Sequence, residues 1–193
     1  MPRLIDKMII NVIIKKKKYM IREANISDCP RIAEIHVFGW RCAYSDFISM
    51  EFLINKMTVK KREIAFLEFL TNQDSNNKTY VFEENNLVKG FMTIGECRDD
   101  DKSKETFELD GIYIDPLFQR QKIGTKFVNL CIEEAIKPKK EEITLWVFEK
   151  NNNSIKFYEK MGFKKDGKIR LTELFKENAI RMKKNYKKRH NCT

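Results

Sequence analysis

The stretch "IYIDPLFQRQKIGTKF" (residues 112–127) joins an apolar, strand-like segment to the start of a helix. The first N–H groups of a helix have no intrahelical partners, and the helix dipole adds attraction for anions, so such a junction can bind phosphate. Phosphate-binding loops usually contain two or three glycines, but here Gly124 stands alone and Lys122 occupies another glycine position. We expect Lys122 to have a right-handed helical backbone, which needs no glycine. The residues alone leave two interpretations open: a phosphate-binding loop, or a capped helix with a basic first turn.

The flanking sequence predicts an alternation of strands and helices. Ser27, Ser49 and Thr58 can cap helices, and Asn85-Asn86 between two apolar runs indicates a hairpin. The strand–helix–strand unit at 106–149 should place its two strands parallel. Together these signals predict an α+β fold with a mixed sheet. The expected strands are 19–25, the two arms of the 79–96 hairpin, 106–115, 142–149, 162–171 and 178–184, and the expected helices are 27–44, two segments between 49 and 70, 122–137 and 153–161.

Composition favours one globular domain with two basic ends. The chain has 193 residues and a net charge of +10, of which residues 1–19 carry +5 and residues 181–193 carry +6, leaving −1 for the rest. We therefore expect a basic extension over 1–19, a domain over 20–184 and a basic tail over 185–193. Such ends add nonspecific affinity for polyanions, but the domain itself has no nucleic-acid signature.

Other features narrow the class of protein further. The five cysteines lack the spacing of a zinc or redox motif, and two histidines are too few for a histidine-rich metal site, so we expect free thiols and no metal. No apolar run reaches the length of a membrane span, and the lysines follow the first apolar run instead of preceding it. We expect a cytoplasmic protein with no membrane partner, and homodimer formation stays open.

Two segments in order resolve the question of the loop. "IYIDPLFQRQKIGTKF" (112–127) followed by "LWVFEKNNNSIKFYEKMGF" (145–163) resembles the GNAT superfamily of acetyl-CoA-dependent N-acetyltransferases. The family pattern is a strand, a Q/R-x-x-G-x-G/A loop, a helix, a strand and an N-x-x-A-x-x-F-Y-x-x-x-G-F segment. The sequence departs from it at Lys122, and Ser154 takes the alanine position. The stretch 21–44 resembles a W-R-x-A-Y bacterial branch, and 108–114 resembles polyamine acetyltransferases.

The resemblance implies a central mixed, mostly antiparallel twisted sheet flanked by helices, and acetyl-CoA as the cosubstrate. Asn151 would hold this cosubstrate, and Tyr158 would be the general acid that protonates the CoA thiolate. Packing beside Phe157 is the alternative role for Tyr158. The backbone positions implied to contact acetyl-CoA are Ile112, Tyr113 and Ile114 on the strand and Gln119, Arg120, Gln121, Lys122, Ile123, Gly124 and Thr125 in the loop.

An amine acceptor arrives protonated, so a base must take its proton. Glu108 and Asp110 lie two apart on a strand, so we expect them to share a face with Ile112 and Ile114. We prefer Glu108 as the base and Asp110 as an acceptor contact, with an exposed charge pair as the alternative.

The acceptor itself is the least determined part. Trp40 and Tyr44 lie four apart on one helix and either pack in the core or line the acceptor pocket. We predict an N-acetyltransferase acting on a small-molecule amine (polyamine, amino acid or aminoglycoside-like) or a peptide N-terminus. The alternative is a non-catalytic acyl-CoA-binding sensor, for which Lys122 would be the sign.

Overall fold

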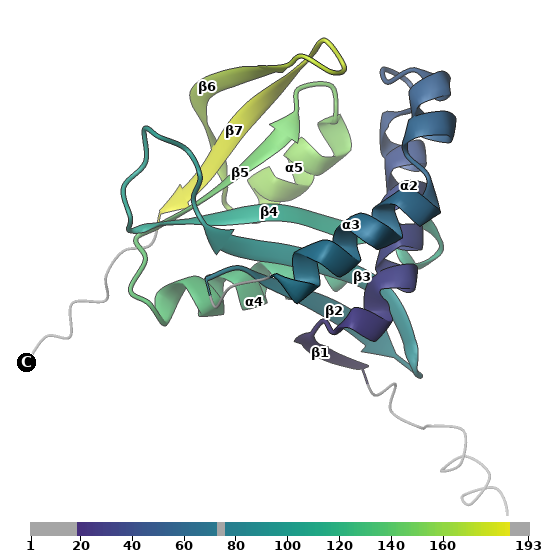
Figure 1. Ribbon diagram of the computed structural model, residues 1–193. Helices are drawn as coiled ribbons and strands as arrows, with labels where there is room; N and C mark the ends of the chain where they lie inside the picture. The colour runs from purple at the N-terminus through teal and green to yellow at the C-terminus, as the bar shows by residue number, and fades with distance from the viewer. Residues whose placement is uncertain (1–18, 73–75, 186–193) are drawn as a thin grey trace, which may run out of the picture.

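The computed structural model describes residues 19–72 and 76–185, which form one seven-stranded sheet with helices on both faces (Figure 1). The strand order is β1-β2-β3-β4-β5-β7-β6, and within the described chain only β4 and β5 pair in parallel. The predicted α+β fold with a mixed, mostly antiparallel sheet is confirmed. The elements are β1 Tyr19–Glu23, η1 Ile26–Asp28, α2 Cys29–Tyr44, η2 Phe52–Lys56, α3 Val59–Thr71, β2 Lys78–Glu84, β3 Leu87–Glu96, β4 Thr106–Ile114, η3 Pro116–Phe118, α4 Ile123–Ile136, β5 Glu142–Phe148, α5 Asn152–Lys160, β6 Lys164–Thr172 and β7 Glu177–Asn185.

The two basic ends cannot be compared with the structure. Residues 1–18 and 186–193 lie outside the described residues, so the predicted extension and tail stay predictions. Within residues 19–72 and 76–185, no helix combines the length and the apolarity needed to cross a bilayer.

Local signals place most element boundaries. The Thr58 side chain accepts a hydrogen bond from the backbone of Lys61 and starts α3 as predicted. The Asn85-Asn86 turn has positive φ angles of 55° and 61°, the conformation a two-residue hairpin needs. The prediction of Ser27 as a cap was wrong. A short 3-10 turn precedes α2, and Asn25 caps that turn instead.

Two apolar cores form on opposite faces of the sheet. One, which includes Phe127, Leu145 and Phe163, packs α4 and α5 against the sheet. The other, which includes Ile32 and Phe66, packs α2 and α3 on the opposite face. Figure 1 shows the two helix pairs on different sides of the sheet. Because both faces are covered, the middle of the sheet is reached from solvent through gaps between elements.

Such a gap lies between β4 and β5. The two parallel strands pair at three positions, from Thr106 opposite Glu142 to Glu108 opposite Thr144. Beyond that point β4 continues along β3, whereas β5 continues along β7. The strands therefore diverge, and the residues of β4 from Leu109 to Ile114 have no hydrogen-bonded partner on β5. We call the opening between the two strands the slot. This slot is the feature around which the predicted site residues gather.

A β-bulge in β4 corrects the predicted side-chain alternation. Thr93 pairs with Gly111 and Ile94 with Leu109, so Asp110 is an extra residue in β4. Leu109 and Ile112 consequently both pack on the α4/α5 side. The expectation that Glu108 and Asp110 share a face with Ile112 and Ile114 was wrong, because the bulge reverses the alternation between them.

Candidate acetyl-transfer site

The loop that precedes α4 contains two residues with left-handed backbone. Arg120 has φ 63°, and Lys122, the N-cap residue of α4, has φ 60° and ψ 16°. The expectation of a right-handed Lys122 was wrong, because the residue has left-handed backbone immediately before the helix begins. An L-residue in this region costs roughly 1–2 kcal/mol relative to a right-handed conformation. Lysine therefore occupies a position whose backbone favours glycine.

The N-terminus of α4 is nonetheless arranged as an anion site. The first intrahelical hydrogen bond runs from the Lys126 amide to the Lys122 carbonyl, at 3.2 Å. The Lys122 side chain makes no capping hydrogen bond, so the first-turn N–H groups from Ile123 to Thr125 stay available to a ligand. The exposed side chains of Arg120 and Lys122 add positive charge beside them.

Gly124 owes its identity to packing. A Cβ atom at this position would lie 3.1 Å from Cζ of Phe157 and 3.4 Å from Cδ1 of Ile114. The first turn of α4 therefore rests directly on α5 and on the end of β4. This contact therefore fixes the start of α4 relative to α5 and to the end of β4.

A second anchor of the loop was missed at the sequence level. Arg31 of α2 donates hydrogen bonds to the Asp115 carboxylate and, at 3.0 Å, to the Val88 carbonyl. Asp115 in turn accepts from the Leu117 amide at 2.9 Å and starts η3. This chain of contacts fixes the segment between β4 and the loop, and it was not predicted because Arg31 and Asp115 come from separate segments of the sequence.

Tyr158 lies in α5, within the apolar core on the α4/α5 side of the sheet and near Tyr113 of β4. It is 8% exposed, and its ring packs against Phe157 and Phe163. Burial, with further contributions from Tyr113 and Cys131, raises the pKa of Tyr158 well above that of a free phenol. The structure therefore presents a buried phenol whose raised pKa keeps it protonated at neutral pH.

Asn151 stands immediately before α5. Its side-chain oxygen accepts from the Ser154 amide at 3.2 Å, so Asn151 is the N-cap of the helix that carries Tyr158. The Asn151 side chain also lies near the Tyr44 hydroxyl, where it partly offsets the rise in the Tyr44 pKa that burial causes. Asn151 therefore lies between the start of α5 and Tyr44 of α2.

Glu108 and Asp110 both form ion pairs with the guanidinium group of Arg98. Arg98, from the connection between β3 and β4, donates from Nε to Oε2 of Glu108 at 3.0 Å and from Nη2 to Oε1 at 2.9 Å. The same Nη2 donates to Asp110. The Glu108 side chain is buried, whereas those of Arg98 and Asp110 are exposed. A proton-accepting role for Glu108 has to operate beside Arg98.

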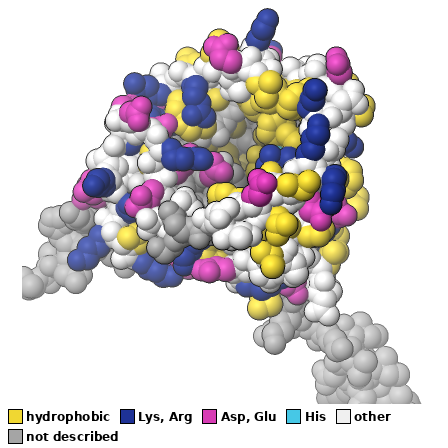
Figure 2. Space-filling view, in the orientation of Figure 1, with side chains coloured by type: hydrophobic (Ala, Val, Ile, Leu, Met, Phe, Trp, Pro, Cys, Tyr) yellow, Lys and Arg dark blue, Asp and Glu magenta, His cyan; other side chains and the backbone are white. Residues whose placement is uncertain are grey.

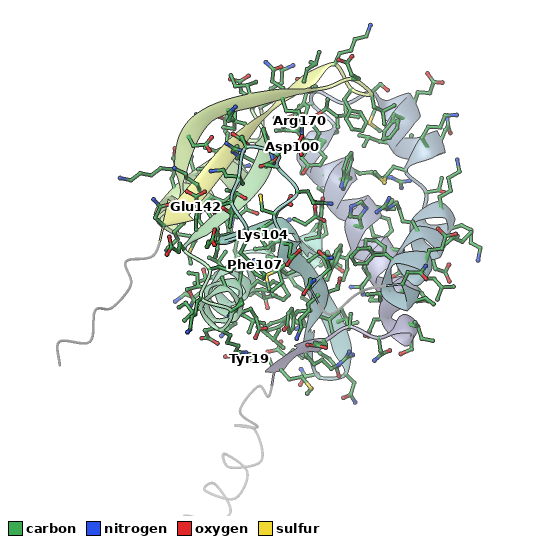
Figure 3. The ribbon with its side chains drawn as sticks, turned by 60° about the vertical axis from the view of Figure 1, so that its left-hand side comes forward. Tyr19, Asp100, Lys104, Phe107, Glu142 and Arg170 are labelled. Atoms are coloured by element: carbon green, nitrogen blue, oxygen red, sulfur yellow. The ribbon has the colours of Figure 1, made fainter. Side chains whose placement is uncertain are left out.

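The connection that carries Arg98 is pinned across the sheet. Arg181, 3% exposed on β7, donates to Asp99, Asp101 and Asp166. Figure 3 shows Asp100 of this connection close to Arg170 of β6, and Lys104 lower in the view, close to Phe107 of β4. The charged connection at residues 97–105 is therefore held against β5, β6 and β7 by hydrogen bonds and ion pairs.

Trp40 and Tyr44 of α2 reach the open end of the slot. Trp40 Nε1 donates to the Tyr113 hydroxyl at 3.3 Å, and the Tyr113 ring folds back over Gly111. Three aromatic residues that the sequence reading missed join Trp40 and Tyr44, namely Phe47, Phe148 and Phe175. Figure 2 shows a hollow in this face, bordered by hydrophobic side chains. No pattern in the sequence links these three, because they come from separate segments.

The structure thus gathers the predicted residues around one slot. Ile112, Tyr113 and Ile114 line the β4 edge, Gln119 to Thr125 form the loop at its end, and Asn151 and Tyr158 lie on α5. Among the described residues, no group of His, Cys, Asp and Glu is placed to hold a metal ion.

Comparison with known proteins identifies the family. Residues 42–163 match the model of the acetyltransferase (GNAT) family. The chain is 29% identical over 151 residues to an uncharacterized N-acetyltransferase of Methanocaldococcus jannaschii, a match that covers 76% of this chain and 61% of that protein. It is also 29% identical to the L-amino acid N-acyltransferase MnaT of Escherichia coli, over 74% of this chain and 78% of that protein. The protein belongs to the acetyltransferase (GNAT) family.

A solved structure agrees with this assignment. The fold superimposes on the PaiA N-acetyltransferase of Thermoplasma acidophilum in complex with coenzyme A with a TM-score of 0.70. The two chains are 21% identical, and the match covers 88% of this chain and 99% of the other. At this identity the likeness supports the fold.

Proposed function

We propose that this protein transfers an acetyl group from acetyl-CoA directly to a primary amine. The observation that carries the proposal is the divergence of β4 and β5, which opens a slot with the α4 N-terminus at one end and Tyr158 of α5 near Tyr113 of β4. The complex of the PaiA relative with coenzyme A supports acetyl-CoA as the cosubstrate.

The loop and strand would hold acetyl-CoA. The backbone N–H groups from Gln121 to Thr125 would bind the pyrophosphate, and Arg120 and Lys122 would add charge. The β4 edge from Ile112 to Ile114 offers backbone groups to an extended pantetheine arm. When bound, acetyl-CoA supplies the thioester carbonyl and a thiolate leaving group.

Two groups would move protons. Tyr158, whose raised pKa keeps it protonated at neutral pH, would donate to the leaving sulfur. Glu108 would accept the amine's proton, and because Arg98 holds both of its oxygens we propose that the proton reaches it through water. Asp110 would attract the ammonium form of the acceptor.

The relatives bear on the acceptor. The MnaT relative acts on L-amino acids by its name, and another, 27% identical, is named as a methionine sulfoximine and methionine sulfone acetyltransferase. We therefore place α-amino compounds ahead of polyamines, aminoglycoside-like compounds and peptide N-termini. A cytoplasmic location also stays our proposal, supported by the free thiols of four described cysteines.

The test is release of coenzyme A from acetyl-CoA over a panel of these amines, with Tyr158→Phe beside the wild type. We expect kcat to fall by roughly 10²-fold or more with unchanged acetyl-CoA affinity, since general-acid groups contribute about that factor. Tyr80→Phe, at a buried tyrosine on β2, is the matched control and should retain activity. Full activity of Tyr158→Phe would refute its role. Tight acetyl-CoA binding without turnover of any amine would favour the sensor alternative.

A further inference from the structure

We propose that the acceptor carries an uncharged apolar group beside its amine, and that this group binds among the rings of Trp40, Tyr44, Phe47, Phe148 and Phe175, which we call the ring pocket. The inference rests on the proposed function and adds the chemical class of the acceptor.

The ring pocket is built around Phe148, the last residue of β5. Its ring centroid lies 5.1 Å from Tyr44, 5.7 Å from Phe47 and 5.9 Å from Phe175. Trp40 closes the set, at 4.9 Å from Tyr44 and 5.6 Å from Phe175. The rings come from α2, the turn after it, β5 and the β6–β7 connection, so the tertiary fold alone brings them together.

These rings are not part of a packed core. All five side chains are half-buried, and none belongs to either of the two apolar cores. A cluster of partly exposed aromatic rings offers apolar surface to a ligand, and clefts lined by aromatic side chains are common binding sites. Figure 2 shows the hydrophobic side chains gathered at the rim of the hollow in this face.

The ring pocket adjoins the transfer chemistry. Trp40 donates to Tyr113, whose ring lies over Gly111 on the divergent part of β4. Tyr44 lies near Asn151, the residue that starts the helix of Tyr158. An acceptor whose nitrogen points to the slot would therefore place its neighbouring group among the rings.

Charge decides between an apolar and a cationic group. Aromatic rings bind both, but a cationic guest is favoured where carboxylates support it. Lys150 Nζ lies 5.9 Å from the Phe47 centroid and is paired with the Glu177 carboxylate at 2.7 Å, so this carboxylate already has a cationic partner. The carboxylates of Glu108 and Asp110 are paired with Arg98. A second ammonium group on the acceptor would meet carboxylates that Lys150 and Arg98 already pair, whereas a hydrocarbon group would meet matching apolar surface.

The test compares acceptors of equal size that differ in one terminal charge. Norleucine and ornithine form one such pair, and hexylamine and cadaverine form a second that lacks the carboxylate. We expect kcat/KM to favour the uncharged member of each pair by roughly tenfold or more, and to rise roughly fourfold per methylene within an alkylamine series. Phe148→Ala and Phe175→Ala should erase this preference while leaving acetyl-CoA binding unchanged, and Phe148→Leu should restore part of it. Phe38→Ala, an exposed aromatic elsewhere on α2, is the control and should change nothing.

A second readout does not depend on turnover. Acceptor binding should alter the fluorescence of the wild type, and Trp40→Phe should lose that change. Equal or better use of cadaverine and ornithine would overturn the inference while the proposed function stands. Absence of both acetyl-CoA binding and turnover would overturn the proposed function, and the inference with it. If turnover is absent, stronger binding of hexylamine than of cadaverine would still support the ring pocket.

Discussion

Replacement of Lys122 by glycine tests the account of the phosphate loop. Lys122 has φ 60° and ψ 16°, in the left-handed region that costs an L-residue roughly 1–2 kcal/mol. Glycine removes this cost but loses more backbone entropy on folding, by roughly 0.5–1 kcal/mol. We therefore expect Lys122→Gly to raise the free energy of unfolding by about 0.5–1 kcal/mol. For a chain of this size that corresponds to a rise in Tm of roughly 1–4 °C.

Thermal and urea unfolding of the apo protein measure this directly. Glu133→Gly is the matched control, because Glu133 is exposed in the interior of α4, where glycine costs about 1 kcal/mol. A rise in the free energy of unfolding for Lys122→Gly, together with a fall for Glu133→Gly, would support the left-handed backbone at Lys122. A loss of stability in Lys122→Gly equal to that of Glu133→Gly would refute it. Acetyl-CoA affinity should fall only modestly, since the backbone N–H groups remain and one lysine charge is removed.

Three further substitutions test packing and electrostatics. Gly124→Ala should destabilise the fold by about 1 kcal/mol, because its Cβ would lie 3.1 Å from Phe157, and Phe157→Leu in the same chain should recover part of the loss, as measured by urea unfolding. Burial, with a smaller contribution from Arg62, lowers the pKa of His36 to about 3, so folding favours the neutral form, and the resulting stability is present above pH 6.5 and lost as pH falls. Wild type should lose about 2 kcal/mol more than His36→Phe between pH 6.5 and pH 5, and equal slopes in acid titrations of stability would contradict the assignment. Arg181→Met should destabilise by about 3 kcal/mol, since buried carboxylates lose their partner, and wild-type stability of this variant in urea would show that the network contributes little.

The sequence could predict what depends on a few neighbouring residues. The hairpin at Asn85-Asn86, the cap at Thr58 and the helix start near Gly124 all follow from interactions within one turn of chain. The residues that line the slot were also indicated, because the two motifs order them along one strand–loop–helix path. Such short-range interactions form between neighbouring residues, so they depend little on how the rest of the chain packs.

The remaining features depend on contacts between distant segments. The bulge at Asp110 is set by the register between β3 and β4, so strict alternation placed Glu108 on the wrong face relative to Ile112. The left-handed backbone of Lys122 lies just before the point where α4 meets α5. The pairing of Arg98 with Glu108 depends on a connection that Arg181, on another strand, holds by hydrogen bonds.

The sequence by itself therefore determined the family, the mixed sheet and the loop before α4, because these are encoded in local periodicity, caps and motif spacing. Only the tertiary structure decided where β4 and β5 diverge, how Glu108 is held and which rings form the ring pocket. The physical reason is that Phe148 and Phe175 meet Trp40 and Tyr44 only after β5, the β6–β7 connection and α2 have packed, and no pattern within a single segment records that meeting.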